Sequence, residues 1–166
     1  MQDITHQAWF SYLSIDQQNL ATTAYALLEQ GEREQVSDYS YVVFPMAKAY
    51  EGFLKKYFFE LGLISMQTYE SRRFRVGRAF NPDLNSTQQD DLWIFDDVAR
   101  MCGLALAREM WDAWIECRNQ VFHYFPLQNR ALSLAQADAK LQQLASVMEG
   151  AIRCQTRNSD QQSSSN

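Results

Sequence analysis

One apolar stretch decides the fold of this chain: AYEGFLKKYFFEL, residues 49–61. Its large apolar side chains recur every three or four residues, which is the spacing of an α-helix with one buried face. They are Tyr50, Phe53, Leu54, Tyr57 and Leu61. The pattern predicts a helix over residues 38–61, in which Pro45 either causes a kink or marks the true start, because proline has no N–H to donate.

The same apolar spacing predicts helices over residues 15–30, 87–102, 104–124 and 134–153. Ser14 with Gln17, and Thr87 with Asp90, have the spacing of helix capping boxes, and Leu92 is expected to face inward. Six glycines and three prolines are too few for the many turns of an ordinary β-sandwich or barrel. We therefore expect an all-α fold, a compact bundle of about five helices over residues 1–157, followed by a disordered polar tail over residues 158–166.

Composition limits the classes of function. The 166 residues are 46% apolar, which fits one domain, and the 15 Lys and Arg against 20 Asp and Glu give a net charge of −5. This charge excludes a generally basic nucleic-acid binder, though not a local basic patch. The apolar runs are too short to span a bilayer. Three widely spaced cysteines and a start that does not resemble a signal peptide predict reduced, core-filling thiols in a cytoplasmic protein.

A polar motif lies near the end of the helix predicted over residues 104–124. At about 100° per residue, Asn119 and His123 share a face with Asp112 and Glu116. Arg118 lies about 140° from His123 on an ideal helix. The two side chains therefore converge only if the arginine reaches around the helix or the end of the helix is distorted.

This motif suits cleavage of a phosphodiester without a metal ion. Histidine can move the proton of an attacking 2′-hydroxyl or of the leaving oxygen, and the product would be a 2′,3′-cyclic phosphate. Arg118 would hold the phosphoryl oxygens, and Asn119 would orient the histidine or the phosphate. The alternative is structural. His123 would be a histidine near the C-terminal end of a helix, where it interacts favourably with the helix dipole, and Arg118 would be a surface charge.

Arg118, Asn119 and His123, with aromatic residues nearby, resemble the signature of HEPN-domain ribonucleases, which are compact helical bundles of bacterial toxins and defence systems. Residues 49–56, AYEGFLKK, are similar to a helix segment of the RNase LS type of toxin, so the resemblance covers about residues 39–125. It implies that Glu51 joins Arg118, Asn119 and His123 as a catalytic residue. On sequence alone, Glu51 is expected instead to form surface ion pairs with Lys48 and Lys55, one helical turn away on either side, in an ion-pair ladder.

The resemblance also implies a function. It implies a metal-independent endoribonuclease with no cofactor and an RNA substrate, the toxin of a toxin–antitoxin or phage-defence system, held in check by an antitoxin protein. Because the chain has one copy of the motif, and the resemblance implies that two subunits bring their motifs together, we expect a homodimer with a composite site. The order His123-Tyr124-Phe125 departs from the His-x-Tyr order of some HEPN toxins, so regulation by modification of that tyrosine is not expected.

An arginine cluster, Arg72, Arg73, Arg75 and Arg78, alternates with Phe74, Val76 and Phe80. It predicts a surface that binds RNA phosphates by charge and bases by stacking. An equal alternative is a solvated loop that pairs with nearby carboxylates. These are Asp90, Asp91, Asp96 and Asp97.

A different class of function also fits the sequence: a non-catalytic, HEPN-like helical module that binds a partner protein or RNA. Its anchors would be tryptophans, since these dominate many interfaces. The residues are Trp93, Trp111 and Trp114.

Overall fold

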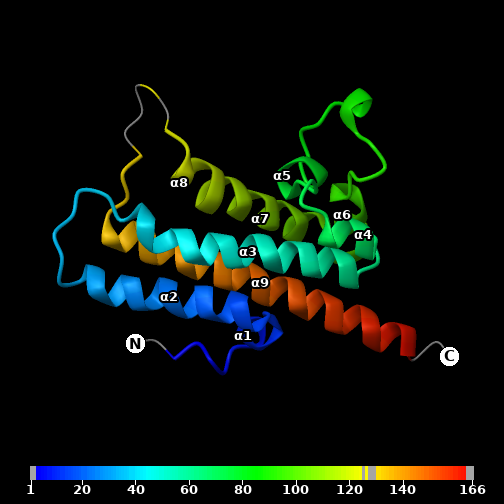
Figure 1. Ribbon diagram of the computed structural model, residues 1–166. Coiled ribbons are helices and arrows are strands. Elements are labelled where there is room, and N and C mark those ends of the chain that lie inside the picture. The colour runs from blue at the N-terminus through cyan, green and yellow to red at the C-terminus, as the bar shows by residue number, and fades with distance from the viewer. Residues whose placement is uncertain (1–2, 125, 127–129, 164–166) are drawn as a thin grey trace.

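The computed structural model describes residues 3–124, 126 and 130–163, with side chains described up to residue 158, and contains no strand among these residues. Four long segments build an all-α bundle and run alternately in opposite directions (Figure 1). They are α2 (Ile15–Gly31), α3 (Ser40–Glu60), the segment from α7 (Leu104–Trp114) to α8 (Gln120–Phe122), and α9 (Leu134–Ser163). The predicted fold class is thus confirmed, and no described helix is long and apolar enough to cross a membrane.

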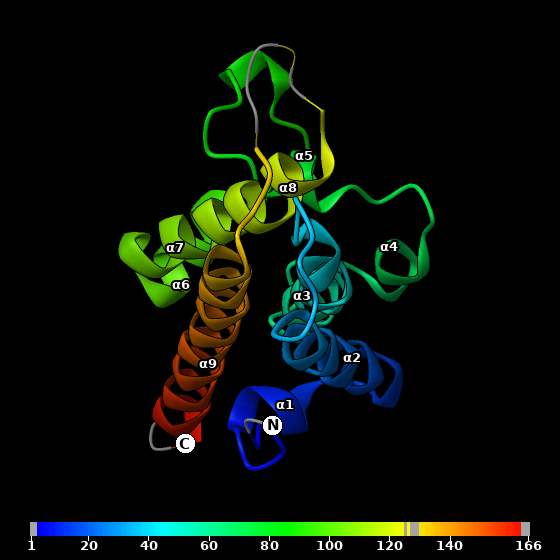
Figure 2. The ribbon, with the colours of Figure 1, turned by 90° about the vertical axis from the view of Figure 1, so that its left-hand side faces the viewer.

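Shorter elements complete the chain. They are α1 (Ala8–Tyr12), α4 (Met66–Glu70), α5 (Val76–Ala79), the 3₁₀ turn η1 (Ser86–Gln88), α6 (Phe95–Cys102) and the π-helical turn η2 (Ile115–Asn119). Figure 2 shows α3 between α2 on one side and the α7–α8 segment on the other, with α9 alongside.

Helix α3 supplies the centre of the core. Tyr50, Phe53 and Tyr57 are fully buried, and their rings stack along the helix at centroid distances of 6.1 and 5.6 Å. Their hydroxyl groups also have partners: Tyr50 donates to the Met110 carbonyl at 2.8 Å, and Tyr57 donates to the Ala151 carbonyl at 3.1 Å. The residues of the predicted stripe therefore bind α3 to both α7 and α9. Pro45 lies inside the helix rather than at its start.

The prediction for residues 87–102 is correct only in its second half. The helix α6 begins at Phe95, and the capping box forms between Asn85 and Gln88 rather than between Thr87 and Asp90. The Asp90 carboxylate accepts instead from Arg78 and from the Leu92 N–H. Such local bonds compete with helix formation, and Leu92 is left 41% exposed.

Helix α9 extends further than the sequence predicts. It continues to Ser163, where the sequence predicts a disordered tail from residue 158, and residues 164–166 lie outside the described part. Asn158, the first residue of that predicted tail, donates to the Met101 carbonyl at 3.3 Å. The polar composition of the tail did not predict this contact. The hydrogen bond from Asn158 joins α9 to the end of α6 without any apolar side chain.

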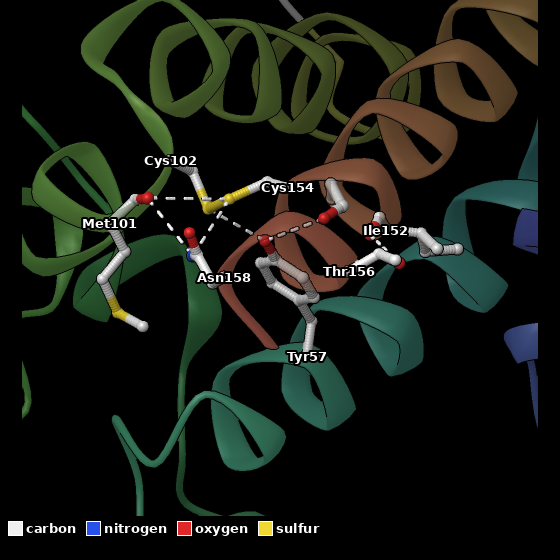
Figure 3. The surroundings of a disulfide bond; sticks show 8 residues. Tyr57, Met101, Cys102, Ile152, Cys154, Thr156 and Asn158 are labelled. Atoms are coloured by element: carbon white, nitrogen blue, oxygen red, sulfur yellow. Dashed lines mark hydrogen bonds between the residues drawn. A yellow bond between two sulfur atoms is a disulfide. The ribbon is translucent and has the colours of Figure 1, made fainter. Parts of the chain in front are cut away.

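The prediction of three reduced thiols is wrong for two of them. Cys102 and Cys154 form a disulfide that ties the end of α6 to α9, with the Tyr57 hydroxyl 3.2 Å from the Cys102 sulfur (Figure 3). The two residues are 52 positions apart, so only the packing of α6 against α9 brings them together. Cys117 is a buried free thiol, as expected of a core filler, and burial raises its pKa to about 12.

We predict that reducing this disulfide lowers the stability of the bundle. Closing a loop of 52 residues stabilises the native state by about 4 kcal/mol in the chain-entropy account. Urea unfolding of the wild type and of a Cys102→Ser/Cys154→Ser variant, each with and without dithiothreitol, measures the effect. The variant should be insensitive to the reductant, and a wild type that is equally insensitive would contradict the prediction.

Candidate functional site

A π-helical turn interrupts the helix that carries the arginine–histidine motif. The turn η2 covers Ile115–Asn119, between α7 and α8, and so includes Arg118 and Asn119. A π turn closes its backbone hydrogen bonds one residue later than an α turn, which changes the direction of the side chains that follow it. The helix is therefore distorted within the motif itself, and the distortion accompanies the contact of Arg118 with α3 rather than one with His123.

The guanidinium of Arg118 lies against α3. Its Nη2 is 3.8 Å from Glu51 Oε2, and its Nη1 donates to Asn119 Oδ1 at 3.1 Å. The guanidinium carbon also lies 5.1 Å from the centre of the Trp114 ring, within the range of a cation–π contact. The structure thus brings three of the four predicted catalytic residues together, from two helices.

Glu51 has two cationic partners. Besides Arg118, it pairs with Lys55 one turn further along α3, at 3.5 Å. The ion-pair ladder that the sequence predicts is therefore confirmed on this side of Glu51. Lys48 has no ion pair among the described residues. Glu51 is both a rung of the ladder and the partner of the motif arginine, so the two interpretations are compatible.

His123 is placed differently. It caps the end of α8 in an extended conformation and is exposed. In the part of the chain that the structure describes, no hydrogen bond or ion pair joins it to Glu51, Arg118 or Asn119. Its imidazole is open to solvent one residue beyond Phe122, where a substrate or a second protomer can reach it.

The polar line predicted along this helix does not form. Glu116 accepts from Lys140 at 2.9 Å and from Gln143 at 3.2 Å, both on α9, while Asn119 bonds with Arg118 beside α3. The prediction assumed a regular α-helix, and the π turn divides these residues between two neighbours. The hydrogen bond from Lys140 lowers the pKa of Glu116, with a smaller contribution from Gln143.

Trp114 links the motif to the arginine cluster. Its side chain is buried, and its indole Nε1 has no hydrogen-bond acceptor among the described residues. A Cβ built on Gly77 would lie 3.0 Å from this nitrogen, so glycine allows α5 to approach the ring closely. The indole therefore lies between Gly77 of α5 and the guanidinium of Arg118. No spacing in the sequence predicts this contact, because Trp114 has the position of an ordinary core residue.

The arginine cluster is exposed, but its aromatic residues are not. Phe74, Val76 and Phe80 are buried in the core, so the prediction that bases stack on them is wrong. The alternation has another physical cause: the apolar residues of this segment face the core, and the arginines between them face solvent. Of the four carboxylates offered as partners, only Asp90 pairs with the cluster in the described part of the chain, through Arg78 at 2.9 Å.

The tryptophans offered as interface anchors are also unavailable. Trp111 and Trp114 are 7% and 3% exposed, and Trp93 is partly buried with its indole donating to the Asn81 carbonyl at 2.7 Å. A binding module built on these three side chains is not what the structure presents.

Comparison of this chain with family models, with curated proteins and with solved structures finds no match. Its function is therefore argued from the residues of the site.

We predict that the bond between Glu116 and Lys140 stabilises the bundle in a pH-dependent way. Because the pKa of Glu116 is lowered in the folded state, its contribution is present above the ordinary value of 4.5 and is lost as the pH falls through the folded pKa. Glu116→Gln should cost about 0.5–1 kcal/mol at pH 7 and nearly nothing near about pH 3. Urea unfolding at both pH values tests this.

The matched control is Glu109→Gln, which changes an exposed glutamate of α7 that has no ion pair or side-chain hydrogen bond among the described residues. Its effect should be small at both pH values. A Glu116→Gln penalty that is the same at low and neutral pH would show that the charge of Glu116 is not what stabilises the contact.

Proposed function

We propose that this chain is a metal-independent endoribonuclease of the HEPN type, the toxin of a toxin–antitoxin or phage-defence system. The supporting observation is that Arg118 lies on the exposed seam between α3 and the α7–α8 segment, within reach of Glu51 and Asn119. His123, at the end of the same segment, supplies an exposed imidazole. Glu51 was nominated by resemblance alone, and its pairing with Arg118 is independent support.

The proposed reaction is attack of a ribose 2′-hydroxyl on the adjacent phosphorus. The 2′-oxygen forms a bond to phosphorus as the bond to the 5′-oxygen breaks, leaving a 2′,3′-cyclic phosphate and a 5′-hydroxyl. His123 moves the proton, since an imidazole can both accept and donate one. Arg118 holds the phosphoryl oxygens as charge builds up, and Glu51 and Asn119 fix the direction of its guanidinium.

A second protomer completes this proposal. His123 has no contact with the other three residues within the chain described, so we expect a homodimer in which two motifs meet across a two-fold axis. An antitoxin protein would act by covering the same seam. Neither a metal ion nor a cofactor takes part in the proposed chemistry.

The cytoplasm is the location we expect for such a nuclease, because its RNA substrates are there. In that reducing compartment Cys102 and Cys154 would be largely thiols, whereas an oxidising compartment would keep the disulfide. Alkylation of thiols at the moment of cell lysis would distinguish the two states.

We predict that His123→Ala lowers RNA cleavage by about 10²- to 10⁴-fold, and that Arg118→Ala lowers it by about 10²- to 10³-fold. Glu51→Gln and Asn119→Ala should cause smaller losses, because these residues orient the arginine. The measurement is cleavage of labelled tRNA and mRNA in excess EDTA, with the chemistry of the fragment ends determined.

Two matched controls are available on the surface. Arg100, which pairs with Asp97 three residues away, and His6, whose side chain is 86% exposed, should both tolerate alanine without loss of cleavage. If the wild type cleaves nothing, even with divalent metal added, while all variants remain folded by circular dichroism, the ribonuclease proposal fails. The non-catalytic binding module is then favoured.

We further predict that the arginine cluster contributes to RNA binding by charge alone. Replacing all four arginines with glutamine should weaken binding and flatten its dependence on salt, by a slope of about 2 to 3, because each phosphate contact on a single strand contributes about 0.7. Arg78 should contribute least, since Asp90 already neutralises it. Filter binding at several salt concentrations measures this, and an unchanged slope would assign the cluster to a solvated loop.

A further inference from the structure

One line of exposed and partly exposed side chains on helix α3 borders the α7–α8 segment. The residues on this line are separated by three or four positions and include two aromatic rings and two lysines. They are Tyr41, Phe44, Lys48, Glu51 and Lys55. Phe44 is 55% exposed and Tyr41 is 38% exposed, whereas the residues between them are buried. Large exposed rings beside the buried core residues of a helix call for a physical explanation.

A second line of side chains lies beside the first. On the α7–α8 segment, Trp114, Arg118 and Phe122 are separated by four positions each, and the two lines touch at two points. Arg118 meets Glu51, as described above, and the Phe122 ring meets the Phe44 ring edge to face, with centroids 5.1 Å apart and planes at 77°. Figures 1 and 2 both show α8 next to the first turns of α3.

The contact with Phe122 holds Phe44 in place without burying it. Edge-to-face pairs stabilise one relative orientation of two rings, and more than half of Phe44 still faces solvent. The ring is therefore positioned in advance, which lowers the entropy lost when a ligand packs on it. The pair lies about 10 Å from Glu51 along α3, at 1.5 Å per residue, so one extended ligand can contact both points.

The charge along this seam favours a polyanion. Lys48, Lys55 and Arg118 are cationic, and Glu51 is the one carboxylate among the residues of the two lines, in a chain whose net charge is −5. An aromatic face beside cationic side chains is the arrangement by which proteins bind single strands: bases stack, and phosphates pair with the cations.

A second copy of the chain fits the Phe44 end of this surface less well. The homodimer proposed above brings the two motifs together; a two-fold contact that also covered Phe44 and Lys48 would bring the Lys48 side chains toward the cations of the partner. Like charges across an interface oppose association, and lysine is depleted from interface cores. We infer that Phe44, held by Phe122, is a stacking platform for a base of single-stranded RNA, with Lys48 and Arg118 holding the neighbouring phosphates.

This platform rests on the proposed function, for which it would position the strand beside Arg118, and it is separate from the arginine cluster. The probe for its test is a short fluorescent 2′-O-methyl oligoadenylate, because blocking the 2′-oxygen prevents cleavage and leaves binding alone to be measured. Binding is followed by fluorescence anisotropy, and the fold of each variant by thermal unfolding.

Phe44→Leu keeps the apolar contact with Phe122 but removes the aromatic face. It should raise the Kd for the oligonucleotide by about 5- to 150-fold, the effect of one lost stacking contact. Phe44→Trp keeps an aromatic face and should remain within about threefold of the wild type. Lys48→Gln should lower the salt slope by about 0.7. The control is Leu104→Ala, which removes a side chain that is 59% exposed at the start of α7, and it should bind normally.

The outcomes separate this inference from the proposed function. If the wild type cleaves natural RNA but Phe44→Leu binds as tightly as the wild type, the platform is refuted and the nuclease stands. If the wild type cleaves no RNA but binds the oligonucleotide through Phe44, the platform stands and the nuclease fails. If the wild type neither cleaves RNA nor binds the oligonucleotide, both proposals are overturned. If Phe44→Leu only turns a dimer into a monomer, the platform alone is overturned.

Discussion

The burial of the aromatic face of α3 is the constraint on which the rest of the structure depends. Tyr50, Phe53 and Tyr57 fill the centre of the bundle, and the hydroxyls of the two tyrosines are satisfied by backbone carbonyls of α7 and α9. Moving either tyrosine would leave a buried hydroxyl without a partner, which is costly. The rotation of α3 is therefore fixed, and with it the line of side chains that remains exposed. Glu51, Phe44 and Lys48, the residues of α3 that the proposals use, lie along that line.

The π turn is the second constraint, because it decides which residues of the motif reach that line. Within a few residues it directs Glu116 to Lys140 on α9 and Arg118 to Glu51 on α3, so the segment is held from both sides. Such turns are found frequently at functional sites, since they place side chains where a regular helix would not. Here the result is an arginine with an orienting carboxylate, an amide and an aromatic ring around it, all before any ligand binds.

The sequence predicted what depends on local periodicity and missed what depends on packing. The spacing of Tyr50, Phe53 and Tyr57 was enough to predict α3, and Ser14 with Gln17 was enough to predict the start of α2, whose capping box forms. The disulfide and the contact between Trp114 and Gly77 join residues far apart in the chain, and no spacing rule could show them. The sequence did not predict the π turn. It showed only that Arg118 and His123 point apart on a regular helix, so that their convergence would require a distorted helix. The grouping of Glu51 with Arg118 came from resemblance, and the structure places them 3.8 Å apart.

The central claim is that RNA binds along the seam between α3 and the α7–α8 segment, and the indole signals of the tryptophans test it directly. The measurement is a two-dimensional ¹⁵N NMR titration of the protein with a short 2′-O-methyl oligonucleotide. The account predicts that the Nε1–H signal of Trp114, whose ring lies under Arg118, shifts with added oligonucleotide, while that of Trp9, on α1 at the other side of the bundle, stays in place. A titration in which Trp9 shifts and Trp114 does not, or in which neither moves at saturating oligonucleotide, would contradict it.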